Sequence, residues 1–146
     1  MFKKILHPTD FSDVAMKAFT FVKGLKSAGA EEVVLLHVID KRSLNSLAMY
    51  AEAGMDFIKI ERDWREKVKQ TLSPLEDELK KSGFKVKVRI EEGIPFRTIL
   101  KAEEEEGVSV IVVGSHGKSN IREMFLGSVS EQVVRKAKNP VLVVKR

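Results

Sequence analysis

Two short, almost uninterrupted apolar runs constrain the fold of this chain more than any other feature. They are VVLLHVI at positions 33–39 and VSVIVV at positions 108–113. Strands of a parallel sheet are covered on both faces and form continuous apolar runs, whereas a strand with one wet face alternates apolar and polar residues. The two runs therefore predict strands of a parallel sheet that helices cover on both sides.

Three further short segments carry strand patterns: Phe2–His7, Phe84–Ile90 and Val141–Lys145. Phe84–Ile90 alternates strictly between apolar residues and Lys or Arg, so one of its faces meets water and it is expected at a sheet edge. Amphipathic stretches separate the five segments, and parallel strands joined through helices require right-handed crossovers. The sequence therefore predicts a single domain, residues 1–146, with a three-layer α/β fold: a doubly wound five-stranded parallel sheet with four main helices.

Local signals place the ends of these helices. Ser12 or Asp13 is expected to cap the first helix, and Asn139–Pro140 to stop the last. Pro74 falls inside the apolar stripe of the second helix and is expected to kink or divide it, because proline removes a backbone donor. Residues Lys41–Met55 show no firm periodicity and are predicted to form a mobile loop before that helix.

The composition excludes several kinds of site. The chain has no cysteine, which rules out disulfides, thiolate zinc sites, iron–sulfur clusters and cysteine nucleophiles. Its net charge of +5 comes from 26 Lys and Arg intermixed with 21 Asp and Glu, so nucleic acid is not the expected partner. The N-terminus lacks the apolar run of a signal peptide, and no apolar run approaches the about 18 residues that cross a membrane. We therefore expect a cytoplasmic protein.

Candidate binding residues follow three of the predicted strands. Sheets of this kind bind ligands at the carboxyl ends of the strands, where the strand order reverses. The segments found there are Pro8-Thr9-Asp10, Asp40 and Gly114–Ser119. Gly117-Lys118-Ser119 looks like the end of a Walker A loop, but that motif needs glycine at position 112, where Val112 lies inside a strand. We therefore reject a P-loop.

Three glycines and two serines remain as candidates for a phosphate site. Gly114 and Gly117 bracket a turn in which backbone amides can approach a ligand with no Cβ in the way. Gly127 and Ser128 lie at a predicted helix N-terminus, which favours an anion, and Ser128 and Ser130 add hydroxyl donors. The alternative is that the glycines only turn the chain and Ser128 only caps a helix. Spacing alone leaves both open.

Three segments together resemble a known family. VVGSHGKSNIREMFLGSVSEQVVRKAKNPVLVVK at 112–145 is similar to the C-terminal signature of the universal stress proteins. ILHPTDFSDVAMKAF at 5–19 resembles the first strand and helix of that family, and LLHVID at 35–40 its second strand. The ATP-binding branch carries G-x2-G-x9-G-[ST], and Gly114, Gly117, Gly127 and Ser128 meet this spacing in full. The resemblance implies a Rossmann-like fold of the adenine nucleotide alpha hydrolase-like type.

The resemblance also implies a binding site for ATP or AMP. Strand ends would line the base and ribose, with the backbone of Val38 at the adenine edge and Asp10 as the ribose or metal-linked carboxylate. The glycine turn would surround the ribose and phosphates, and the last helix would bind the phosphates. The residues implied are Pro8, Thr9, Asp10, Val38, Gly114, Ser115, His116, Gly117, Gly127, Ser128, Val129 and Ser130.

Further properties come with the resemblance. It implies Mg²⁺ or Mn²⁺ bound with the nucleotide, although no metal ligand is assigned, and a homodimer formed through the last strand, Val141–Lys145. One departure is that Lys118, Ser119 and Asn120 stand where the family often has Arg, a small residue and another Gly. Lys118 keeps a positive charge but not the bidentate fork of arginine, which puts its contact with phosphate in doubt.

Three functions remain open. The expected one is an ATP-binding stress protein whose ligand orders the Gly114–Gly127 and Lys41–Met55 segments and so changes a surface that an unidentified protein partner recognises. The alternatives are a hydrolase or nucleotidyl transferase on the same fold, and a scaffold that binds no nucleotide. The sequence shows no Ser-His-Asp, paired-carboxylate or HExxH arrangement, so we expect at most slow ATP turnover. Of the three histidines, His7 and His37 are expected in the core, and only His116 at the ligand.

Overall fold

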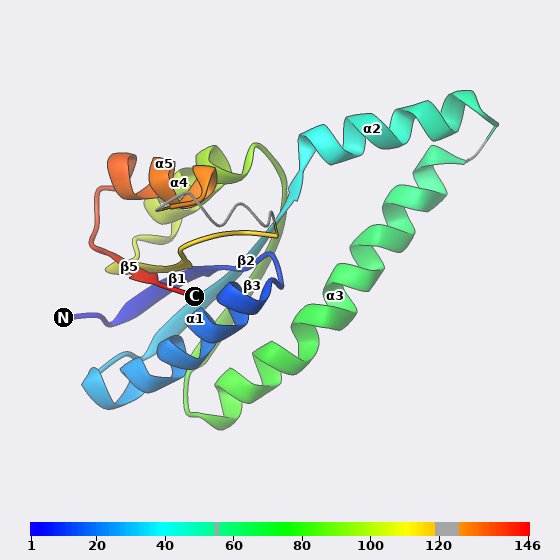
Figure 1. Cartoon of the computed structure of the whole chain (residues 1–146). Helices are drawn as coiled ribbons and strands as arrows, with labels where there is room; N and C mark the ends of the chain where they lie inside the picture. Colours follow the sequence, from blue (N-terminus) through cyan, green and yellow to red (C-terminus); the bar gives the residue numbers. More distant parts are fainter. Residues whose placement is uncertain (55, 119–125) are drawn as a thin grey trace.

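A computed structural model describes residues 1–54, 56–118 and 126–146 (Figure 1). Its centre is a five-stranded, wholly parallel sheet in the order β3-β2-β1-β4-β5. The two apolar runs form inner strands and the alternating run forms an edge strand, as predicted. The strands are β1 (Lys4–Pro8), β2 (Glu32–Asp40), β3 (Lys85–Gly93), β4 (Val110–Gly114) and β5 (Val141–Val144).

Helices cover both faces of the sheet (Figure 1). Ile5 and Leu35 lie in a core packed against α1 and α3, while Leu6 and Leu36 lie in a second core packed against α4 and α5. This arrangement confirms the predicted three-layer α/β fold. The helices are α1 (Asp13–Gly24), the 3₁₀ turn η1 (Leu25–Ala28), α2 (Lys41–Glu52), α3 (Phe57–Lys81), α4 (Pro95–Glu106) and α5 (Ser128–Lys136). In the part of the chain that the structure describes, none of them is both long enough and apolar enough to span a membrane.

The helix ends follow the local signals in the sequence. Ser12 caps α1, since its Oγ accepts a hydrogen bond from the backbone N–H of Ala15 at 3.2 Å. Gly107 ends α4 in the left-handed conformation, with φ of 59°. α5 ends at Lys136, shortly before Asn139–Pro140, as predicted.

The prediction of a loop at Lys41–Met55 is wrong over most of its length, because Lys41–Glu52 forms helix α2 directly after β2. Its first turn is held by Asp40, whose Oδ1 accepts a hydrogen bond from the backbone N–H of Arg42 at 2.9 Å. Leu44 is buried, and α2 contacts both β2 and α3. Most of the other described side chains of α2 are exposed, so the helix has no buried apolar stripe that would mark it in the sequence. The described residues therefore contain five α-helices, one more than predicted. Met55, the last residue of the predicted loop, is not among the described residues.

Pro74 does not divide the second predicted helix. α3 is one helix of 25 residues, and Pro74 lies inside it on the exposed side, while Leu72 and Leu75 next to it are buried. Proline has no N–H, so the carbonyl of Gln70, four residues before Pro74, receives no hydrogen bond within the helix. Gln70 is also exposed, so water can replace the missing hydrogen bond. The buried leucine stripe keeps the helix continuous.

Candidate functional site

The strand order reverses between β1 and β4, which lie side by side with Leu6 opposite Ile111. From β1 the chain continues to β2 on one side, and from β4 to β5 on the other. The segments that leave the carboxyl ends of β1 and β4 begin at Thr9 and Ser115. The predicted candidate segments therefore meet at the place where this fold class binds ligands.

The turn between β1 and α1 is held by its own side chains. Thr9 Oγ1 accepts a hydrogen bond from the N–H of Phe11 at 3.2 Å, and Asp10 Oδ1 accepts one from the N–H of Ser12 at 3.0 Å. Thr9 is also tied to β2, because its N–H donates to the carbonyl of Leu36 at 2.8 Å. Phe11 has φ of 64° and is the one non-glycine residue with positive φ among the described residues. The turn is thus tightly specified, and Asp10 lies at its centre.

The glycines of the motif are required for close approach within the protein. None of the three, Gly114, Gly117 and Gly127, has a positive φ, so turning the chain is not the reason for glycine there. A Cβ on Gly114 would lie 2.8 Å from Val14 Cγ1 and 3.2 Å from the backbone nitrogen of Ala15. Gly114 therefore lets α1 pack against β4, and that its backbone also admits a ligand stays a prediction.

Gly117 and Gly127 bring the predicted phosphate segments together. A Cβ on Gly117 would lie 2.8 Å from Asp10 Oδ2, so this glycine lies directly against the carboxylate of the β1–α1 turn. A Cβ on Gly127 would lie 3.2 Å from the Cα of His116, and the N–H of Gly127 donates to the carbonyl of Ser115 at 2.7 Å. The N-terminus of α5 is therefore fixed beside the glycine turn.

The two serines of α5 differ. Ser128 is exposed at the first position of the helix, as expected of a hydroxyl that faces a ligand. Ser130 is buried and donates its hydroxyl proton to the carbonyl of Gly114 at 2.6 Å. That proton joins α5 to the end of β4, and a contact of Ser130 with the ligand stays a prediction.

The other predicted residues lie wholly or partly in the core next to the site. Pro8 ends β1, and Val38 and Val129 pack partly buried against the core shared with α4 and α5. Ser115 is buried, with its Oγ 2.9 Å from Nδ1 of the neighbouring His116. Ser119 and Asn120 lie outside the described residues.

Both histidines predicted in the core are buried, but they contact different parts of the molecule. His7 Nδ1 lies 2.9 Å from the carbonyl of Val112, and its Nε2 is buried without a partner. Burial lowers the pKa of His7 to about 4. His37 Nδ1 lies 2.8 Å from the carbonyl of Thr9, and its ring stacks on Phe11 with 4.7 Å between centroids. Burial also lowers the pKa of His37. His37 is thus in contact with the site, which its place in an apolar run did not indicate.

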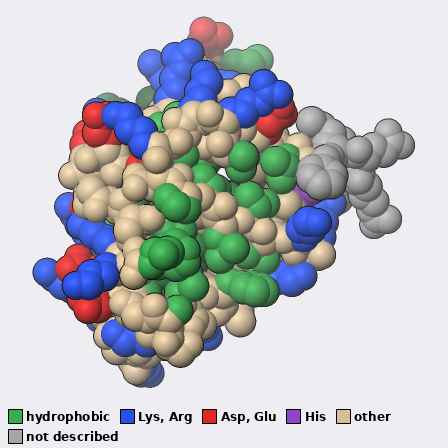
Figure 2. Space-filling view, turned by 90° about the vertical axis from the view of Figure 1, so that its left-hand side faces the viewer, with side chains coloured by type: hydrophobic (Ala, Val, Ile, Leu, Met, Phe, Trp, Pro, Cys, Tyr) green, Lys and Arg blue, Asp and Glu red, His purple; other side chains and the backbone are tan. Residues whose placement is uncertain are grey.

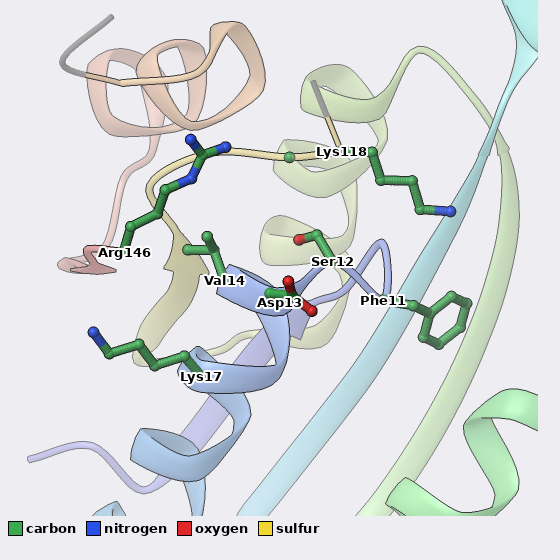
Figure 3. A pocket seen from close by; sticks show the side chains of 8 residues that line it. Phe11, Ser12, Asp13, Val14, Lys17, Lys118 and Arg146 are labelled. Atoms are coloured by element: carbon green, nitrogen blue, oxygen red, sulfur yellow. The ribbon is translucent and has the colours of Figure 1, made fainter. Parts of the chain in front are cut away.

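A cleft of about 500 Å³ opens at the start of α1, next to the glycine turn (Figure 3). Of the predicted site residues only Gly117 lines it. Three cations, Lys17, Lys118 and Arg146, stand around it, but they do not converge: Lys118 extends toward β2, away from the other two. In the described residues no group of three or more His, Asp or Glu side chains is placed to hold a metal ion.

Comparison with known proteins gives consistent relatives over the full chain. Residues 1–145 match the model of the universal stress protein family. Universal stress protein MJ0577 of Methanocaldococcus jannaschii is 44% identical, with 100% of this chain and 96% of the relative covered. Universal stress protein YxiE of Bacillus subtilis is 35% identical, with 99% and 100% covered. The solved structure of MJ0577 superposes with a TM-score of 0.88 at 46% identity, covering 100% of this chain and 97% of that one.

Proposed function

The chain belongs to the universal stress protein family, and on that premise we propose that it binds an adenine nucleotide, ATP or AMP, at the carboxyl ends of β1 and β4. One observation carries the proposal: Gly117 lies against the carboxylate of Asp10, and Gly127 beside it fixes the start of α5. A carboxylate suited to a ribose, a glycine at the end of the turn and a helix N-terminus suited to phosphate thus lie next to one another.

The residues present fit a nucleotide. A side chain at position 117 would press on the carboxylate of Asp10, and one at position 127 would fill the space between the glycine turn and α5. Ser128 is exposed at the end of the helix dipole that favours an anion. Two solved universal stress proteins are complexes with cAMP and with dAMP, the second from Archaeoglobus fulgidus, at 22% and 21% identity to this chain. They share its fold, with TM-scores of 0.66 and 0.65, and support an adenine nucleotide as the class of ligand.

The proposed ligand would bring Mg²⁺ or Mn²⁺ with it, and the ion would neutralise part of the phosphate charge. With no cluster of acidic or histidine side chains assembled in the described part of the chain, most of the ligands of the ion would be phosphate oxygens and water. Asp10 is the carboxylate beside the glycine turn. The described residues assemble no acidic or histidine cluster beside the site, and we propose a binding protein that responds to nucleotide in the cytoplasm, with at most slow turnover.

We also propose that two copies associate through β5. This strand forms one edge of the sheet, and Leu142 on it and Val134 on the neighbouring α5 are 38% and 42% exposed. Figure 2, seen from the side of β5, shows hydrophobic side chains gathered at the centre of that face with Lys and Arg around them. An uncovered apolar edge favours pairing with a second strand.

The dimer is tested with Leu142→Lys, which places a charge on the proposed interface. Sedimentation should show a dimer for the wild type and a monomer for this variant. Ile58→Lys is the matched control, because Ile58 is 68% exposed at the start of α3, away from β5. A dimer that survives Leu142→Lys and dissociates in the control would exclude β5 as the interface.

The nucleotide site is tested by denaturing freshly purified protein, identifying any released nucleotide, and titrating the emptied protein with ATP, ADP and AMP. Asp10→Asn keeps the oxygen that accepts from Ser12 but removes the charge, and should weaken ATP binding about tenfold. Asp13→Asn changes the acid three residues along, on α1, and should leave the affinity unchanged. A wild type that releases no nucleotide and binds none would leave the fold as a scaffold.

A further inference from the structure

We propose that His37 is a positioning residue of the nucleotide site, which holds the β1–α1 turn in the shape that presents Asp10. The inference rests on the proposed function, because Asp10 belongs to the proposed site. It does not follow from the motif, since His37 lies in a buried strand and none of the glycine spacing involves it.

The first contact is a hydrogen bond at the point where β1 leaves the sheet. His37 Nδ1 lies 2.8 Å from the carbonyl oxygen of Thr9, and since a carbonyl only accepts, Nδ1 carries the proton and donates it. The N–H of Thr9 donates to the carbonyl of Leu36 at 2.8 Å. Both backbone polar groups of Thr9 are therefore bound to β2. Its N–H is bound to the backbone of Leu36, and its carbonyl is bound to the side chain of His37.

The second contact is a ring stack on the strained residue of the turn. Phe11 has φ of 64°, a conformation that residues with a Cβ rarely adopt. Its ring lies over the His37 ring with 4.7 Å between centroids and 17° between planes. A stacked pair is favourable and offsets part of that strain, so the ring of His37 stabilises Phe11 in the left-handed conformation.

Asp10 lies between the two residues that His37 holds. With Thr9 fixed by a hydrogen bond and Phe11 by a stack, the backbone of Asp10 has little freedom, and its carboxylate is directed at Gly117. Without these contacts Phe11 can relax to a negative φ and carry Asp10 with it. The ligand would then have to order the turn as it binds, which lowers its affinity.

His7 offers a matched comparison. It is a buried histidine on the neighbouring strand whose Nδ1 also lies close to a backbone carbonyl, that of Val112 at 2.9 Å. Its ring faces Phe19 of α1 in the core. The charge of Asp10 favours the protonated form of His7, but among the described residues His7 has no hydrogen bond or ring stack with the β1–α1 turn. A change at His7 should therefore affect folding and leave the turn in place.

The experiment separates the two contacts. His37→Asn keeps an N–H donor at the δ position and loses the ring, His37→Phe keeps the ring and loses the donor, and His37→Ala loses both. ATP affinity of the folded proteins is measured by calorimetry, and hydrogen exchange at Phe11 and Ser12 is measured without nucleotide. We expect about tenfold weaker binding and faster exchange in His37→Ala, with partial recovery of both in His37→Asn and His37→Phe.

The controls distinguish failure of the inference from failure of the proposed function. His7→Asn should lower stability but keep the wild-type affinity. Wild-type affinity in His37→Ala, or no recovery in either of the other variants, would overturn the positioning role. A wild type that binds no nucleotide would remove the proposed function instead, while the exchange measurement would still test whether His37 holds the turn.

Discussion

Histidine and glycine occur both in the interior of the sheet and at the edge formed by the carboxyl ends of its strands, here called the rim. In the two places they contact different kinds of groups. In the interior, His7 contacts the carbonyl of Val112, and Gly114 lies against the backbone of α1. At the rim, His37 contacts the turn before α1, and Gly117 lies against a carboxylate. Packed backbone cannot move aside when a side chain beside it changes, whereas a turn or the end of a side chain can. Interior substitutions should therefore cost folding, and rim substitutions should cost binding.

The largest expected effect is the acid sensitivity of the interior histidine. Burial lowers the pKa of His7 from 6.5 to about 4, so the folded protein binds this proton more weakly than the unfolded chain. The group is neutral in both states above pH 6.5, and below it only the unfolded chain gains the proton until the pH reaches 4. The free energy of unfolding should thus fall by about 3 kcal/mol between pH 6.5 and 4 on account of His7.

This contribution is measured by comparing chemical denaturation of the wild type and His7→Asn across that pH range. The variant keeps an N–H donor near the carbonyl of Val112 but cannot titrate, so its stability should decline less steeply on acidification. Acidic groups titrate in both proteins and cancel in the difference. If the free energy of unfolding falls equally with pH in the two proteins, His7 is not the source of the acid sensitivity.

Next in size is the substitution Gly114→Val. The added Cβ would lie 3.1 Å from the backbone carbon of Val14 and 3.2 Å from the backbone nitrogen of Ala15, so α1 must shift. We expect a loss of about 2 kcal/mol in the free energy of unfolding, typical of overpacking. Gly24→Ala is the control, because nothing lies within 4 Å of a Cβ there, and it should not destabilise. Equal stability of Gly114→Val and the wild type would contradict the contact with α1.

The rim counterpart, Gly117→Ala, should separate binding from folding. Its Cβ would meet only Asp10 Oδ2 at 2.8 Å, and a carboxylate can rotate away, so stability should change little. The displaced carboxylate should weaken ATP binding about tenfold, or about 1.4 kcal/mol. In the background of Asp10→Ala the same substitution should have no further effect on affinity. An equal loss in that background would mean that the alanine acts directly on the ligand.

Strand positions were predictable from the sequence because burial on both faces leaves a local trace. VVLLHVI and VSVIVV are almost entirely apolar because helices cover both sides of the sheet. Helix α2 was missed because Leu44 is the one buried side chain among those described in it, so no buried apolar stripe marks the helix in the sequence. Pro74 did not divide α3, because its effect depends on whether the freed carbonyl meets water, which only the packed helix decides.

The site was predictable as a set of segments and not as a set of contacts. Topology alone places Asp10 and the glycine turn at the same edge of the sheet. Spacing, however, gives no distance between segments, so it cannot tell that Gly114 lies against α1 while Gly117 lies against Asp10. For the same reason His37 looked like an ordinary core histidine, because the carbonyl it contacts lies 28 positions away in the chain.

The smallest effect is expected from a substitution of Lys118. Removal of its charge should change the pKa of His37 but not that of His7. Burial lowers the pKa of His37 most, the hydrogen bond with Thr9 raises it, and the positive charge of Lys118 lowers it further. The pKa of His7 is set by burial, by the carbonyl of Val112 and by the charge of Asp10. The side chain of Lys118 extends toward β2 in Figure 3, away from Arg146 and Lys17. Lys118→Met should therefore raise the pKa of His37, leave that of His7 in place, and change ATP affinity by less than about threefold. Titration of the histidine resonances and calorimetry, with Lys17→Met as control, measure these effects. A tenfold loss of affinity would instead place the ammonium of Lys118 on the phosphates, and the rim would then bind the ligand by charge as well as by shape.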